Sequence, residues 1–397
     1  MTKQEEISTY GPGTFGASRV PTLAPAKEEA HTGLMDRLLA WGHYAGLDSA
    51  VEIDHQLEAE LHIISERQQQ EKGKQQIFCD AQRWNFENVN RAPYFLFILK
   101  VSCFFLPLFV WGGLAGVMLG DYLYVPVLGL SLAFINLYLA TSSKKRYAYL
   151  IMILGAVVTA AAIAWNQNAL WGYWADQTAF WLGMILFGIA LFGADALLWL
   201  YARFYTHDGS GFNRRDGTLT IARRFRKPFV APFYEFDPYI QLQVTPHGGH
   251  DYVLWLRHRY TDTSVCLATK LHSLGLDKPN VLAFWDTLQR YMDVDEPLPD
   301  LPILEQSRHL DPVTAAFDRA HDRPPRRWRD TDVKTWRRKE ARELRKRLEA
   351  YPWQQHPCIL RARIDPNLSI ETYYRQQEAR GIHATPKAND FDNVHRP

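Results

Sequence analysis

Cysteine is scarce in this chain of 397 residues, which contains only four of them. No two of these residues share a CxxC spacing, so the sequence offers neither a disulfide framework nor the paired thiols of a zinc ribbon. We expect all four to be reduced thiols. They are Cys79, Cys103, Cys266 and Cys358.

Signature motifs of catalysis are also missing. The chain has no GxSxG, HExxH or nucleotide-binding fingerprint. The run from Asp208 to Gly211 is rich in glycine but lacks the Lys and the Ser or Thr of a phosphate loop. His247 and His250 flank a Gly-Gly turn, with no further metal ligand close in sequence. We therefore expect no enzyme, and no catalytic, cofactor-binding or metal site.

A secretory signal is not visible at the start of the chain. Residues 1–30 mix Gly, Pro, Ser and charges, without a basic region followed by an apolar core. We interpret residues 1–31 as a disordered N-terminus and residues 32–92 as a cytoplasmic helical arm. In this arm, apolar residues recur at helical spacing from Ile53 to Ile64. Asp48 or Ser49 is the expected cap of that helix.

Long apolar runs, in contrast, are plentiful between residues 93 and 204. Each is near or above the ~20 residues that a helix needs to cross ~30 Å of hydrocarbon. Lys and Arg favour the cytoplasmic side, and the basic connector Ser143–Arg146 lies between the second and third runs. We expect a four-helix transmembrane domain over residues 93–204, in a multi-pass protein of the bacterial inner membrane with both termini cytoplasmic. The four runs are 93–119, 123–140, 147–165 and 178–201.

Three polar residues, Lys100, Asn136 and Asp195, interrupt these runs. At ~1.5 Å per residue, all three would lie about 10 Å below the cytoplasmic surface. Charges inside a membrane are costly and usually paired, so we expect a Lys100–Asp195 pair with Asn136 nearby. This intramembrane polar cluster would either join helices, with Lys100 extending to the headgroups, or have a functional role.

The sequence after residue 204 has the alternation of short β-strands. Asp216-Gly217 between two extended runs is a strong hairpin signal, because both turn positions tolerate positive φ. A helix over 277–293 places its apolar residues on one face, and Asp277 supplies a cap. We therefore predict a cytoplasmic pleckstrin-homology-like β module over 205–296, closed by an amphipathic helix. With the membrane helices, the expected fold class is an α+β membrane protein.

This region also carries a resemblance to a known family. Its marks are Phe212-Asn213-Arg214 followed by Gly217, then Trp255 in a strand, then Phe284-Trp285 and Tyr291-Met292 before a Pro-rich exit. Over about residues 90–304 the chain resembles an uncharacterised family of bacterial inner-membrane proteins, in which apolar helices precede a β-plus-helix domain. Members are often associated with type VI secretion effector loci. The resemblance implies a location in the inner membrane and genes near type VI secretion effectors. It implies no catalytic residues.

Residues 297–397 form a Pro-rich linker, a basic helix and a polar tail. The basic helix, over 330–351, carries many Arg and Lys residues and a narrow apolar stripe. Such a helix is consistent with contact to anionic lipid, with an acidic protein partner or with a solvated face. We expect no nucleic-acid binding, since no recognition fold accompanies the charge. The residues considered for lipid or partner contact are Arg326, Arg327, Arg329, Arg337, Arg338, Lys339, Arg345 and Lys346.

The sequence thus favours a non-enzymatic interaction protein of the inner membrane. Its expected partners are membrane lipids and a protein, which in a type VI setting would be an effector or spike component. The expected role there is immunity or effector accessory. The alternative is an antibacterial effector whose helices insert into a target membrane and leak ions. A transporter is disfavoured, because the apolar runs show a single polar layer and no repeats.

Overall fold

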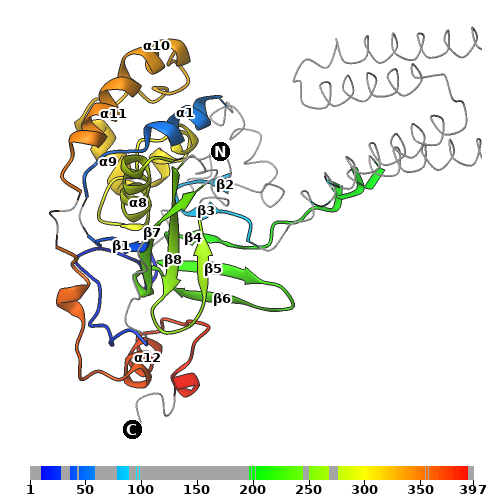
Figure 1. The fold of residues 1–397 in the computed structure, drawn as a ribbon, viewed down its shortest axis with the longest axis vertical. Helices are drawn as coiled ribbons and strands as arrows, with labels where there is room; N and C mark the ends of the chain where they lie inside the picture. Colours follow the sequence, from blue (N-terminus) through cyan, green and yellow to red (C-terminus); the bar gives the residue numbers. More distant parts are fainter. Residues whose placement is uncertain are drawn as a thin grey trace, which may run out of the picture. The chain divides into compact units, whose positions relative to one another are not determined.

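The structure is a computed structural model that describes residues 10–27, 36–42, 44–58, 78–88, 203–244, 250–267, 276–353 and 357–391, with single residues at 95, 98, 355 and between 196 and 201. The chain divides into two compact units, one formed by residues 1–89 with 206–397 and the other by residues 90–205. Nearly all of the described residues belong to the first unit (Figure 1).

The predicted four-helix transmembrane domain over 93–204 is contradicted. Among the helices that the structure describes, none is both long enough and apolar enough to cross a bilayer. The longest of them has 15 residues, which is about 22 Å at ~1.5 Å per residue and too short for ~30 Å of hydrocarbon. The same finding contradicts the expected multi-pass inner-membrane location. The predicted spans between residues 99 and 195 lie outside the described residues, as do Lys100, Asn136 and Asp195.

The predicted fold class is also wrong in its second part. The described residues form a mixed α/β architecture with two antiparallel sheets, in place of one pleckstrin-homology-like module over 205–296. The first sheet has the order β1-β7-β8-β9. Its strands are β1 (Asp36–Leu38), β7 (Phe236–Val244), β8 (His250–His258) and β9 (Ser264–Cys266).

The second sheet has five strands in sequence order. They are β2 (Phe78–Cys79), β3 (Arg83–Asn85), β4 (Gly211–Asn213), β5 (Thr218–Arg223) and β6 (Arg226–Pro232). Strands from the N-terminal arm therefore complete both sheets: Asp36 pairs with Gln241, and Trp84 pairs with Phe212. A module that began at residue 205 would lack these strands, which is why the predicted boundary fails.

The predicted hairpin at Asp216-Gly217 is confirmed between β4 and β5. Gly217 has φ +68°, a region that side-chain-bearing residues rarely adopt. A Cβ there would also lie 2.1 Å from the carbonyl oxygen of Gly13. The turn thus has a segment from the N-terminal part of the chain directly against it.

Helix α8 (Lys278–Met292) confirms the predicted amphipathic helix, and Asp277 caps it by accepting a hydrogen bond from the backbone N–H of Asn280 at 2.9 Å. Its inner face enters an aromatic core. The ring of Trp285 packs edge-on against Trp41 at 4.7 Å, and Tyr291 packs against Trp84 at 5.1 Å. Residues far apart in sequence thus meet on one helix.

Residues 10–27 belong to the N-terminus that was predicted to be disordered, but they pack against the rest of the unit. Phe15 and Leu23 are fully buried, and Phe15 packs on Trp41 and Phe233. The backbone N–H of Leu23 donates to the carbonyl of Arg363 at 2.9 Å. The segment is a buried strap that joins the sheets to the C-terminal part of the chain.

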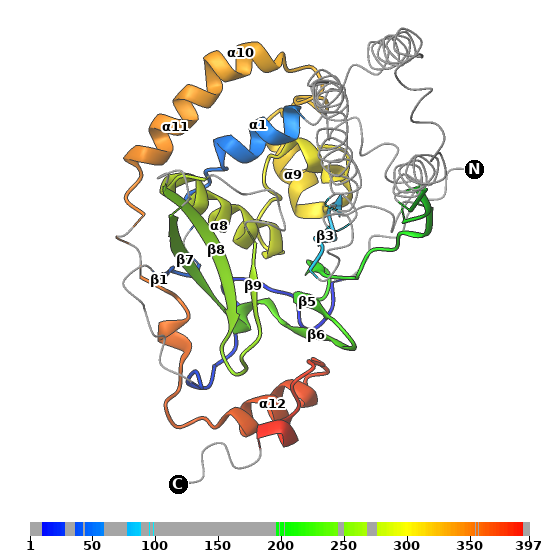
Figure 2. The same ribbon diagram turned by 45° about the vertical axis from the view of Figure 1, so that its right-hand side comes forward.

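The remaining helices surround this core (Figure 1 and Figure 2). Helix α1 (Ala50–Glu58) begins after Ser49, whose Oγ accepts from the N–H of Glu52 at 3.2 Å, so the predicted cap is confirmed. In both views α10 and α11 lie at one end of the unit and α12 at the opposite end. The C-terminal helices are α9 (Pro312–Ala320), α10 (Val333–Arg338), α11 (Glu340–Ala350) and α12 (Ile370–Ala379), and the short 3-10 turns are Phe233–Glu235, Pro302–Leu304, Arg308–Leu310, Arg361–Arg363 and Ala388–Phe391.

Helix α12 is attached to the sheets through a buried carboxylate. Both oxygens of Glu235 are used: Oε1 accepts from the hydroxyl of Tyr373 at 2.7 Å, and Oε2 accepts from Tyr374 at 2.7 Å. The Nε2 of His258 lies 2.9 Å from Oε2 of the same carboxylate. Burial, and then the negative charge of Glu235, raise the pKa of both tyrosines well above the usual value, so both hydroxyls remain donors.

A second buried charge explains the Arg in Phe212-Asn213-Arg214. The Arg214 side chain is fully buried and donates to the carbonyls of Arg290, Tyr291 and Glu296. It also pairs with the buried carboxylate of Asp311 at 3.3 Å. Arg214 therefore ties the β4–β5 turn to the end of α8 and to the start of α9, which is a structural role.

Candidate interaction site

The predicted basic helix consists of two shorter helices. Asp332 caps α10, because its carboxylate accepts from the N–H of Thr335 at 2.9 Å. The chain leaves regular helical geometry at Lys339, with φ −111° and ψ −75°, and then continues as α11. We call α10 and α11 together the basic arch. Its outer course is visible in Figure 2.

The apolar side of the basic arch is turned inward. Trp336 is 2% exposed and packs edge-on against Trp328, with ring centroids 6.4 Å apart. Ala341 and Leu348 of α11 are 1% exposed. The narrow apolar stripe seen in the sequence thus packs on the protein's own core, with Trp336 and Leu348 buried and Leu344 half-buried.

One arginine of the basic arch is fixed to helix α1. The Nε of Arg337 lies 2.5 Å from Oδ1 of Asp54, and its Nη2 contacts the carboxylate of Glu58. The hydrogen bonds that Arg337 donates to these two carboxylates raise its pKa, so its charge is secure. Arg337 is therefore committed to an intramolecular contact.

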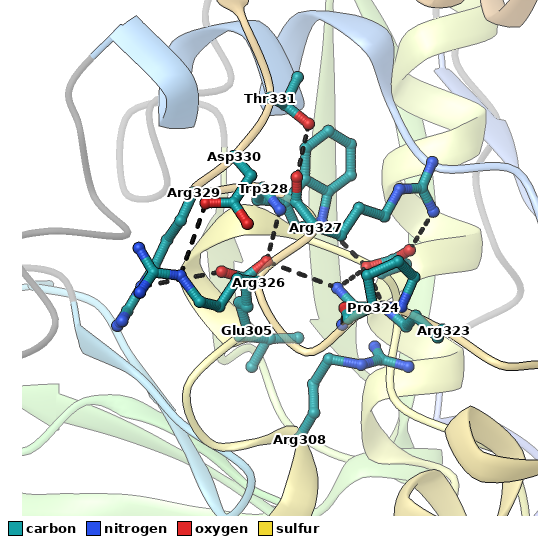
Figure 3. A network of polar contacts seen from close by, with 12 residues as sticks. Glu305, Arg308, Arg323, Pro324, Arg326, Arg327, Trp328, Arg329, Asp330 and Thr331 are labelled. Atoms are coloured by element: carbon teal, nitrogen blue, oxygen red, sulfur yellow. Dashed lines mark hydrogen bonds and ion pairs between the residues drawn. The ribbon is translucent and has the colours of Figure 1, made fainter.

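The arginines that precede the basic arch also form contacts with acidic residues of the same chain. Figure 3 shows them around Glu305, and a second acidic residue, Asp300, binds the same group. Asp300 accepts from Arg323 at 2.7 Å, from Arg327, and from the indole N–H of Trp328 at 2.9 Å. Burial alone would raise the pKa of Asp300, but the hydrogen bond and charge of Arg323 outweigh it, so the pKa is lowered.

Glu305 forms the other acidic centre, which Figure 3 labels. Its Oε2 accepts from the backbone N–H of Trp328 at 2.5 Å, and Arg329 lies 3.8 Å from Oε1. Within the described residues Oε1 has an ion-pair neighbour but no hydrogen bond. Among the described residues Arg326 pairs only with Asp330, at 3.5 Å, and both side chains are exposed, so that pair contributes little, about 0–1 kcal/mol.

A cleft of about 1020 Å³ lies beside this network, between α9 and the residues before the basic arch. Arg308 lines this cleft. Its guanidinium donates two hydrogen bonds, of 2.9 and 2.7 Å, to the carboxylate of Asp318, which neutralises its charge. The Arg308 guanidinium also donates to the carbonyls of Leu298 and Pro299. The polar groups of the cleft mostly bind one another, so we assign it a structural role.

The eight residues that the sequence singled out therefore divide into two groups. Arg326, Arg327, Arg329 and Arg337 form ion pairs with acidic residues of the same chain. Arg338, Lys339, Arg345 and Lys346 are exposed, and no ion pair to them occurs in the described ranges. Three further exposed cations, Lys334, Arg342 and Arg347, belong to the second group. Their helical spacing beside the chosen residues was the signal that the sequence analysis passed over.

The other residues that were considered for chemistry form no assembled site among those that the structure describes. Where the structure describes the chain, no group of three or more His, Cys, Asp or Glu residues is arranged to hold a metal ion. His247 lies outside the described residues, and the side chain of His250 is likewise not described. In the run Asp208–Gly211, Asp208 accepts from the N–H of Ser210 at 2.8 Å and from Asn88 at 2.7 Å. These contacts are internal to the loop and its neighbour.

Comparisons of this chain with protein-family models, with curated proteins and with solved structures found no match. The resemblance to the type VI-associated family stays a prediction. Function has to be argued from the basic arch itself.

Proposed function

We propose that this protein is a non-enzymatic interaction protein that binds an acidic protein partner through the outward face of the basic arch. The observation that carries the proposal is the group of exposed cations on α10 and α11 without ion-pair partners in the described part of the chain. Nearby arginines of the same segment are neutralised by intramolecular carboxylates. The contrast leaves one face with charge available to a second molecule.

An acidic protein fits this face better than a lipid surface does. A helix that lies in a membrane interface inserts its apolar side among the acyl chains. Here that side is occupied, because Trp336 and Leu348 are buried against the core. Glu343 and Glu349 also interrupt the cations on α11, and a mixed face suits a protein surface with its own charge pattern.

The basic arch would act mainly through steering and complementarity. Exposed charges raise the rate of encounter with an acidic surface, and this effect weakens as the ionic strength rises. The guanidinium groups of Arg342 and Arg345 can form bidentate hydrogen bonds with carboxylates. Because Arg337 fixes α10 to α1, the cations are presented on a supported surface.

The resemblance noted in the sequence supplies a setting for the partner. We propose a type VI effector or spike component, with an immunity or accessory role for this chain. Its support is the block around Phe212-Asn213-Arg214 and the helix with Phe284-Trp285. The alternative of an ion-leaking effector depended on the predicted membrane spans, and it is not carried forward.

The test is photo-crosslinking in cells from position 342, where a photoreactive residue replaces Arg342 in the full chain. We expect an acidic protein to crosslink, and the crosslink to disappear in the variant Arg338→Glu/Lys346→Glu. The matched control is Arg224→Glu/Lys227→Glu, which changes net charge equally at the exposed β5–β6 turn. The control should retain the crosslink.

Two results would overturn the proposal. The first is a crosslinked protein whose yield is unaffected by charge reversal on the basic arch. The second comes from flotation with phosphatidylglycerol vesicles: binding that is lost in Arg338→Glu/Lys346→Glu, without any protein crosslink, would assign the face to lipid. Co-expression with a toxin encoded by a neighbouring gene then separates an immunity role from an accessory role, since rescue of growth indicates immunity.

A further inference from the structure

A smaller pocket lies elsewhere in the same unit, and its described lining includes no residue of α10 or α11. It has a volume of about 230 Å³ and is lined by β1, β7, the first turns of α8, Trp353 and residues between 357 and 361. That volume corresponds to about eight water molecules in the liquid. It is slightly below the ~300–1,000 Å³ of drug-sized sites, so it suits a small ligand.

Three cations line this pocket: Arg37 of β1, Lys278 of α8 and Arg361. The described lining residues include no Asp or Glu. Across the described part of the chain, none of these three side chains forms a hydrogen bond or an ion pair. The large cleft beside α9 differs, because there Arg308 and Arg323 are neutralised by aspartates.

Three cations line one pocket whose described lining contains no acidic residue, so the pocket has a positive potential that favours an anion. The guanidinium groups of Arg37 and Arg361 offer forked donors, and Lys278 adds a compact charge. Carboxylate and phosphate are the groups that this set of donors matches.

The rest of the pocket is apolar. Ile240 of β7 and Leu282 of α8 contribute aliphatic carbon, and Trp353 contributes an indole ring. The indole N–H of Trp353 already donates to the carbonyl of Leu348 at 2.8 Å. Trp353 therefore offers its ring as an apolar surface, and its polar atom is not needed for the ligand.

We propose that this pocket binds a small organic anion, with a carboxylate or phosphate group held by Arg37, Lys278 and Arg361 and a compact apolar body held by Leu282 and Trp353. The site is independent of the proposed protein interface, because it uses different residues on different elements.

The first test is calorimetric titration of the full chain with four probes: indole-3-acetate, phenyl phosphate, inorganic phosphate and the neutral indole-3-acetamide. We expect the two organic anions to bind and the other two to bind at least about tenfold more weakly, which is the loss of one charge-assisted hydrogen bond. Equal binding of the amide would overturn the role of charge. Equal binding of inorganic phosphate would overturn the role of the apolar wall.

Variants then locate the binding. Arg361→Gln and Arg37→Gln change exposed side chains, so we expect unaltered thermal unfolding and at least about tenfold weaker binding. The matched control is Arg338→Gln on the basic arch, which should bind the probes as the parent chain does. Binding that is unchanged in Arg361→Gln, or lost in Arg338→Gln, contradicts the assignment.

A reporter inside the pocket gives a second readout that does not depend on affinity alone. Cys358 lines the pocket and is half-buried, whereas Cys266 lies on β9 outside it. Indole-3-acetate should slow alkylation of Cys358 by iodoacetamide and leave Cys266 unaffected, as measured by peptide mass spectrometry. Equal protection of both thiols, or of neither in the presence of a bound anion, would refute the location.

Discussion

The buried carboxylate of Glu235 should hold helix α12 on the sheets, and removal of one tyrosine hydroxyl tests this directly. Tyr373→Phe and Tyr374→Phe each delete one hydrogen bond of 2.7 Å to Glu235. The rings keep their packing, since Tyr373 lies 5.4 Å from Tyr260 and Tyr374 stacks on Phe391 at 5.2 Å. The substitution therefore isolates the hydroxyl.

The magnitude follows from the charge and burial of the acceptor. A hydrogen bond to a charged group contributes about 1.5–3 kcal/mol, whereas a neutral one contributes about 0.5–1.5 kcal/mol. Glu235 is fully buried, so water cannot replace the lost donor. We expect each variant to lower the free energy of local opening of α12 by about 1.5–3 kcal/mol. The double variant should cost more than either single one, because only His258 then remains as a neighbour of the carboxylate.

The assay is native-state hydrogen exchange of the α12 amides, which reports local opening even where the whole chain does not unfold in one step. Tyr234→Phe is the matched control, since its hydroxyl donates to the neutral amide oxygen of Gln377 at 3.2 Å in the same cluster. It should cost about 0.5–1.5 kcal/mol. If Tyr373→Phe and Tyr374→Phe cost no more than Tyr234→Phe, the carboxylate does not anchor α12 and the reasoning is wrong.

Three further substitutions probe the fold. Burial raises the pKa of Asp286 to about 6 despite its bond to Arg290, so between pH 4 and 6 the folded state binds more protons than the unfolded state. Stability should fall by about 3 kcal/mol as the pH rises through this window, and denaturation curves of Asp286→Asn should lack that component. Gly217→Ala should cost at least about 1–2 kcal/mol in denaturant unfolding, because φ is +68° and a backbone oxygen blocks the Cβ; an unchanged midpoint would contradict the turn geometry. Arg214→Met should cost about 3–5 kcal/mol in thermal or denaturant unfolding, since it leaves Asp311 buried without its cation, and Arg214→Met/Asp311→Leu should recover part of the loss.

Elements that depend on local chemistry could be predicted from the sequence. The cap at Asp277 and the apolar period of α8 lie within one 15-residue stretch, and both are confirmed. The turn at Asp216-Gly217 is set by the positive φ that Gly217 adopts. The alternation expected after residue 204 is confirmed in β7 and β8.

Elements that depend on distant partners could not be predicted. β1 pairs with β7 although Asp36 and Gln241 are separated by about half of the chain, and nothing in a three-residue strand indicates its partner. Residues 10–27 have the composition of a flexible segment, but Phe15 finds an aromatic core contributed by Trp41 and Phe233. Apolar run length alone led to the membrane prediction, which the described helices contradict.

In the candidate site, too, local features could be predicted from the sequence and contacts with distant residues could not. The basic composition of residues 326–347 identified the correct segment, but charge on a sequence carries no information about pairing. Arg337 is neutralised by Asp54 and Glu58 only because α10 lies beside α1. The exposed cations could be separated from the paired ones only after the tertiary contacts of Asp300 and Glu305 were known.

The exposed charges of α11 carry a cost that the rest of the fold does not explain. Arg342 and Lys346 are four residues apart on one helix face, and a like-charged pair at this spacing destabilises a helix by about 0.2–0.5 kcal/mol. Arg345 lies three residues from Arg342 and adds a similar repulsion. Glu349, four residues from Arg345 and three from Lys346, offsets part of this repulsion. Arg327 and Arg337, in contrast, are neutralised by acidic residues elsewhere in the chain. Repulsion that stays on one face, over a core that is otherwise well packed, is expected of a surface kept for a partner of opposite charge.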